Sequence, residues 1–143
     1  MSSVGSTKPY ALLFRWAVLI GILQDWLVGI PGIFIPNTVL ALVAQPAAQP
    51  VWPAFACLLL VLLSLFYIPG AFDPFRYHAT AILTVVARAA GVVFFLVIWR
   101  GATPPWFGYL DLIFTILQGV LLWLTFRQHQ PQPETASGQR VTA

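Results

Sequence analysis

The residues of this chain that could do chemistry are a few charged and amide side chains set within long apolar runs. Arg88 lies halfway along Ala79 to Trp99, a nearly unbroken run of Ala, Val, Ile, Leu and Phe. An arginine at the centre of such a span costs about 2.5–3.5 kcal/mol on insertion scales, so its charge needs a protein partner or a water-filled site. The candidate intramembrane polar site comprises Arg15, Asp25, Arg88, Asp111 and Gln118.

Helical spacing predicts a partner for Arg88. Asp111 and Gln118 fall on one polar stripe of the last apolar run. Folding the chain about residues 102–103 brings Arg88 level with residue 117, next to Gln118. Because an arginine side chain on a helix leans toward the N-terminus, we expect it to reach Gln118 rather than Asp111, which lies roughly 9 Å further along.

Asp25 and Asp111 lie at a similar depth in the first and last apolar runs, which adjoin in a simple ring of four helices. Two carboxylates at one depth repel if both are charged, so one is expected to keep a proton. A shared proton is one way for a carrier to couple transport to a proton gradient. The alternative is that each carboxylate only forms hydrogen bonds with neighbours such as Gln24 and Thr115, or with water.

The chain lacks the residue sets that catalysis commonly uses. Its one cysteine, Cys57, excludes an intramolecular disulfide, a thiol-exchange pair and a cysteine-based metal cluster. His78 and His129 fall at the interface and in the tail, so no pair of haem ligands lies within the bundle. No Ser-His-Asp set, Gly-rich phosphate loop or metal-ligand spacing occurs. We therefore expect no catalytic site, no cofactor and no metal.

The composition is that of an integral membrane protein. The 143 residues are 59% hydrophobic and only 8% charged, whereas soluble domains carry about 25% charged residues. The net charge of +3 comes from seven Lys and Arg against four acids, which is too little for a nucleic-acid surface.

The predicted fold is all-α: an integral membrane four-helix bundle that runs up and down. The expected helices, each long enough for a hydrocarbon core of roughly 30 Å, cover about residues 10–30, 51–69, 74–100 and 104–127. Asp73 with Pro74, and Thr103 with Pro104, give the start signals of the third and fourth helices, and Gly101 gives a left-handed cap to the third. Short connections on both sides of the third helix make its neighbours antiparallel.

Three further segments flank or interrupt the spans. Residues 1–9 form a polar N-terminus, and charges within the first span argue against a cleaved signal peptide. Pro31 and Pro36 are expected to end the first helix, and the short apolar piece over residues 39–44 to lie on the membrane surface, with a re-entrant segment as the alternative. Residues 128–143, rich in Gln, Pro, Ser and Thr, are predicted to be a disordered cytoplasmic tail.

The distribution of basic residues predicts the orientation. Four spans place both termini and the 70–78 turn on one side of the membrane. That side holds Lys8, Arg76, Arg127 and Arg140, with Arg15 close by, whereas the other side holds only Arg100. The positive-inside bias then places both termini in the cytoplasm of a multi-pass protein of the bacterial inner membrane.

The four short spans, Arg15 in the first, the Gly-Ile-Pro-Gly-Ile-Phe-Ile-Pro stretch after it and Arg88 in the third resemble the DoxX-like group. These are small four-helix bacterial inner-membrane proteins. The resemblance implies an accessory role beside a membrane oxidoreductase, and it carries over no functional residue.

Three functional hypotheses follow. The first is a small polytopic inner-membrane protein without its own catalytic site. It would be an accessory or assembly subunit of a membrane oxidoreductase complex, or a homo-oligomer. Its partners would be the lipid bilayer and another membrane protein or a second copy, but no nucleic acid. The second is a proton-coupled carrier or channel that uses Asp25, Asp111 and Arg88. The third is a binder of a lipophilic ligand such as a quinone, held between aromatic helices.

Overall fold

A computed structural model of the protein describes residues 9–42, 44–47, 49–101 and 104–128. These residues are organised as helices, with a π-helical segment, η1, directly continuing α4. In chain order the elements are α1 (Pro9–Phe34), α2 (Pro36–Leu42), α3 (Val51–Phe72), α4 (His78–Val93), η1 (Phe94–Ile98) and α5 (Trp106–Arg127).

Four of the helical stretches are long and apolar enough to cross a membrane: α1, α3, α4 with η1, and α5. The four apolar helices expected from the sequence are therefore confirmed. Their outer surfaces are apolar, with exposed side chains such as Leu27, Phe66 and Val97. The buried polar and charged residues are Asp25, Ser64, Thr84, Arg88, Gln118 and Thr125. This distribution is the reverse of that in a soluble domain, where charged groups lie outside and few polar groups are buried.

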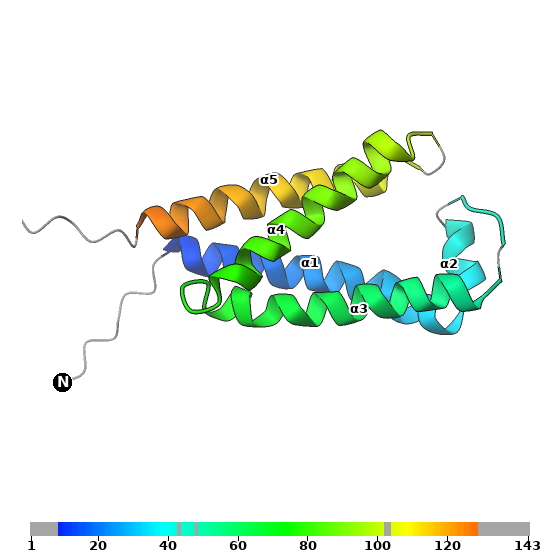
Figure 1. Cartoon of the computed structure of the whole chain (residues 1–143), viewed down its shortest axis with the longest axis horizontal. Helices are drawn as coiled ribbons and strands as arrows, with labels where there is room; N and C mark the ends of the chain where they lie inside the picture. Colours follow the sequence, from blue (N-terminus) through cyan, green and yellow to red (C-terminus); the bar gives the residue numbers. More distant parts are fainter. Residues whose placement is uncertain (1–8, 43, 48, 102–103, 129–143) are drawn as a thin grey trace, which may run out of the picture.

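The helices pack around a small core. α1 lies against α3 and α5, and α4 lies against α3 and α5. The indole Nε1 of Trp26 on α1 donates a hydrogen bond of 2.7 Å to Ser64 Oγ on α3. The buried apolar cluster consists of Phe14, Val18, Ile22, Tyr67, Ala71, Ala81 and Leu122. Figure 1 shows that α4 and α5 lie close to α1 and α3 near the connection between α3 and α4, and diverge from them toward α2.

Prolines end the helices less often than the sequence predicted. α1 continues through Pro31 to Phe34, and α3 continues through Pro69 to Phe72. A proline removes only one backbone donor, and the next helical bonds still form, as from Ile35 N to Pro31 O at 2.8 Å. Helices packed against neighbours tolerate such a loss, so the expected stops at Pro31 and at residue 69 were wrong.

Two predicted helix starts were early. α4 begins at His78 rather than at Pro74, because Asp73 Oδ1 accepts from the Arg76 N–H at 3.0 Å and stabilises a turn there instead of a helix. α5 begins at Trp106 rather than at residue 104. The third predicted helix, 74–100, instead divides into α4 and η1 and ends at Ile98. Gly101 has the expected left-handed conformation, with φ of 85°.

The predicted interfacial piece is helical, but it begins earlier than expected. α2 covers Pro36–Leu42 and follows α1 almost directly. The expectations about residues 1–8, Thr103 and the tail from 129, including Lys8, His129 and Arg140, lie outside the described residues.

Candidate functional site

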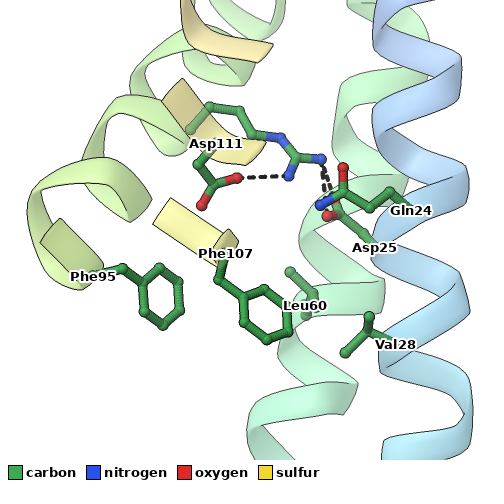
Figure 2. Close-up of a pocket in the computed structure, with 8 residues that line it drawn as sticks. Gln24, Asp25, Val28, Leu60, Phe95, Phe107 and Asp111 are labelled. Atoms are coloured by element: carbon green, nitrogen blue, oxygen red, sulfur yellow. Dashed lines mark hydrogen bonds and ion pairs between the residues drawn. The ribbon is translucent and has the colours of Figure 1, made fainter. Parts of the chain in front are cut away.

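Three helices bring ionisable side chains together: Asp25 on α1, Arg88 on α4 and Asp111 on α5. We call these three residues the Arg88 cluster. Arg88 Nη2 donates to both carboxylate oxygens of Asp25, each at 2.8 Å, and to the backbone oxygen of Gly21 at 2.9 Å. Arg88 Nη1 donates to Asp111 Oδ1 at 2.9 Å. Figure 2 shows the carboxylates of Asp25 and Asp111 joined to one guanidinium by dashed lines.

The cluster is withdrawn from the surface of the bundle. Arg88 is 7% exposed and Asp25 is 5% exposed, while the side chain of Asp111 is 14% exposed. Hydrogen bonds between ionised groups are about twice as strong as neutral ones. Removing one partner of such a buried pair leaves an uncompensated charge, which is the costly event. The cluster therefore ties α1, α4 and α5 together.

The predicted pairing of Arg88 with Gln118 was wrong. Gln118 is fully buried, and its Nε2 donates instead to the backbone oxygen of Ala17 at 3.1 Å. Counting residues along the hairpin predicted the level of the two helices but not the direction of a long, flexible side chain. Arg88 turns toward two carboxylates because an ionised acceptor binds a guanidinium more strongly than a neutral amide does.

Asp25 and Asp111 do lie near one another, on either side of the Arg88 guanidinium. Each contacts Arg88, and within the described residues no hydrogen bond joins the two carboxylates. The alternative partners named from the sequence do not bind them either: Thr115 Oγ1 donates to the backbone oxygen of Asp111, at 2.7 Å. The guanidinium thus lies between the two carboxylates and balances one of their two charges.

Two glycines let the cluster lie against helix backbones. A Cβ atom at Gly21 would lie 3.0 Å from Arg88 Nη2, and one at Gly91 would collide with Asp111 Oδ2. Contacts this short displace neighbouring atoms, so a larger residue at Gly91 would displace the Asp111 carboxylate. The position of this carboxylate beside Arg88 therefore depends on Gly91.

A cavity of about 240 Å³ adjoins the cluster. Its polar end is formed by Gln24, Asp25, Arg88 and Asp111, and its apolar wall by Val28, Leu60, Phe95 and Phe107. Figure 2 shows these side chains around the cavity, with the two phenylalanines together on one side. The rings of Phe95 and Phe107 have centroids 5.9 Å apart and planes 26° apart. The cavity therefore combines a charged end with an aromatic and aliphatic wall.

A second, smaller cavity of about 180 Å³ also adjoins the cluster and adds Leu63, Tyr67, Ala87 and Gly91 to the lining. Asp25, Arg88 and Asp111 line both cavities. Open space therefore reaches all three charged side chains.

Arg15, the remaining predicted site residue, does not join the cluster. Its guanidinium lies over the ring of Phe72, with Cζ 3.8 Å from the ring centroid. Its Nε is buried and has no hydrogen-bond partner among the described residues. No group of three or more His, Cys, Asp or Glu side chains able to hold a metal ion occurs in the described part of the chain.

None of the four apolar residues of the cavity wall was predicted from the sequence, although three of them share a helix face with a charged residue. Phe107 precedes Asp111 by one helical turn, and Val28 follows Asp25 by one turn, so each shares a face with a carboxylate. Phe95 lies two turns after Arg88. Leu60 has no charged neighbour on α3, and nothing in the sequence distinguishes it from other leucines of that helix.

No protein-family model, curated protein or solved structure matches this chain.

Proposed function

We propose that this chain is a multi-pass membrane protein that binds a lipophilic small molecule, with the polar head of the ligand at the Arg88 cluster. The observation that carries the proposal is the cavity of about 240 Å³, with charged groups at one end and an apolar wall. Small-molecule sites are typically concave and apolar, with a few polar groups that orient the ligand. We propose no catalytic step.

The membrane setting is supported by the apolar outer surface and the buried polar groups of the bundle. We propose that α1, α3, α4 with η1, and α5 run up and down across the bacterial inner membrane. The distribution of arginines supports cytoplasmic termini. Such a setting would deliver a lipophilic ligand from the bilayer, where its concentration is highest.

The chemistry of the cavity suits an amphipathic ligand. Phe95, Phe107 and Leu60 offer dispersion contacts to a hydrocarbon or ring system. Gln24 offers an amide at the polar end, where it can both donate and accept hydrogen bonds. The sequence-based proposal of a quinone belongs to this class of ligand.

The other two hypotheses remain proposals. An accessory subunit would use the apolar outer surface against partner helices, but the same surface suits lipid equally well. The resemblance to the DoxX-like group identifies no residue that would contact such a partner. In a proton-coupled carrier built on Asp25 and Asp111, Arg88 would lie between the two carboxylates.

The proposed function is tested by filling the cavity. Val28 lines the cavity on α1, whereas Val120 on α5 is exposed on the outer surface. We expect radiolabelled 1-octanol to bind the wild type and Val120→Phe in lipid nanodiscs, and to bind Val28→Phe about tenfold more weakly or worse. Protein-free nanodiscs correct for partitioning into lipid, and gel filtration checks folding. Equal binding by all three proteins, or no saturable binding by any, would refute the proposal.

A further inference from the structure

The charges of the Arg88 cluster do not balance. One guanidinium faces two carboxylates, which gives a formal charge of +1 − 2 = −1 when both acids are ionised. Among the described residues, no other basic side chain forms an ion pair with Asp25 or Asp111. A net charge in an apolar bundle is costly unless a proton or a counter-ion compensates it. One further positive charge, from a proton or a cation, would therefore make the cluster neutral.

The two carboxylates are used unequally. Asp25 engages Arg88 through both of its oxygens. Asp111 uses only Oδ1, and its Oδ2 has no hydrogen-bond partner in the described part of the chain. Asp111 is also the more exposed of the two, and it lines both cavities. The unused acceptor of the cluster is thus on Asp111.

Two aromatic rings line the cavity that Asp111 also lines. Phe95 and Phe107 stack with centroids 5.9 Å apart and line the same cavity as Asp111. The face of a phenyl ring attracts cations, and desolvated ring faces are a common means of binding ammonium groups. A ligand head that only accepts hydrogen bonds, such as a quinone carbonyl, would instead meet the lone pairs of Asp111 Oδ2.

From the unbalanced charge, the unused oxygen and the aromatic wall, we infer that the cavity takes a lipophilic monocation. Its ammonium group lies at Asp111 and the rings of Phe95 and Phe107, and its hydrocarbon part lies against Val28 and Leu60. This inference rests on the proposed function, and it names the class of ligand that the site selects.

The experiment compares octylamine, which is cationic at neutral pH, with the neutral 1-octanol in nanodiscs of zwitterionic lipid. The variants are Asp111→Asn and, as a matched control, Asp73→Asn in the turn between α3 and α4. We expect octylamine to bind the wild type about tenfold more tightly than octanol, and Asp111→Asn to remove that preference. Asp73→Asn should retain it. Phe107→Leu provides a second variant, which should weaken octylamine binding more than octanol binding.

The outcomes separate the two proposals. If octanol binds and octylamine binds no more tightly, the cation is excluded, a proton holds the excess charge, and the proposed function stands. If neither probe binds, both proposals fail. The wild type and both variants, Asp111→Asn and Phe107→Leu, could all bind octylamine more tightly than octanol. In that case the assignment of the ammonium group to Asp111 is wrong. Gel filtration of each variant establishes that it is folded before binding is measured.

Discussion

At the scale of single residues, the Arg88 cluster is the group of side chains that is costliest to bury. Its guanidinium satisfies two carboxylates and a backbone oxygen, all within a bundle that otherwise presents apolar side chains. The cost of a substitution depends on the charge that remains. Removing Arg88 leaves two carboxylates facing each other, whereas removing the charge of Asp111 leaves a balanced pair between Arg88 and Asp25.

We therefore predict an order of stabilities. Arg88→Leu should lower the free energy of unfolding by about 3–5 kcal/mol, the usual cost of breaking a buried ion pair. Asp25→Asn should cost less, and Asp111→Asn least, because Asp111 makes one bond and its loss removes the excess charge. Unfolding in mixed micelles by titration with a denaturing detergent measures all three. An Asp111→Asn protein as unstable as Arg88→Leu would contradict this account.

Residue types and depths could be predicted from the sequence, but partners could not. The apolar surroundings of Arg88 required a buried partner, and helical spacing found Asp25 and Asp111 at one level. The choice of Gln118 failed because the rotamer of an arginine with four rotatable bonds is decided by its surroundings. With the observed bonds, we expect Arg88→Leu to be costlier than Gln118→Leu, because Arg88 binds two carboxylates whereas Gln118 donates to one backbone oxygen.

At the scale of elements, the wall of the cavity depends on how α4 ends. The helix widens into the π-helical segment η1 over Phe94–Ile98, and Phe95 from this segment lines the cavity. Such segments frequently occur at functional sites, since they redirect side chains within a continuing helix. Nothing in the run Phe-Phe-Leu-Val-Ile predicts it, because it contains neither proline nor glycine. Helix existence followed from hydropathy, while helix ends depended on local bonds such as that from Arg76 N to Asp73 Oδ1.

Gly91 and Gly119 offer a matched comparison between helix propensity and packing. A Cβ at Gly91 would collide with the Asp111 carboxylate, whereas one at Gly119 would lie at an ordinary 3.6 Å from Val85 Cγ1. We predict that Gly91→Ala destabilises the protein by about 1–3 kcal/mol through overpacking. Gly119→Ala should be neutral, or stabilising by up to about 1 kcal/mol, since alanine favours helix more than glycine does. Thermal unfolding in detergent compares them; a loss of stability in Gly119→Ala equal to that in Gly91→Ala would refute the packing argument.

At the scale of the whole molecule, the distribution of side chains is the reverse of that in a soluble protein. Large apolar residues such as Leu27 and Phe34 are exposed, while Arg88 and Gln118 are buried. Hydropathy predicted this without knowledge of the contacts, because it depends on composition along each helix rather than on a particular neighbour. The expected orientation depends on only a few arginines and is open to direct test.

We predict that both termini lie in the cytoplasm. Alkaline phosphatase fused after residue 127 should be inactive, and a fluorescent protein at the same place should fluoresce. Insertions within residues 45–50 should behave in the opposite way. Phosphatase activity at the C-terminal fusion, or fluorescence from the 45–50 insertion, would reverse the assignment.

The three members of the Arg88 cluster occupy different places in the order of synthesis. Asp25 belongs to the first helix, Arg88 to a later one and Asp111 to the last. If the helices enter a bilayer in that order, the arginine arrives when one counter-charge is already there and the other has not yet been translated. Asp25, which accepts from the guanidinium with both oxygens, is then the residue that stabilises Arg88 when α4 enters the bilayer. Asp111 then joins an ion pair that is already balanced.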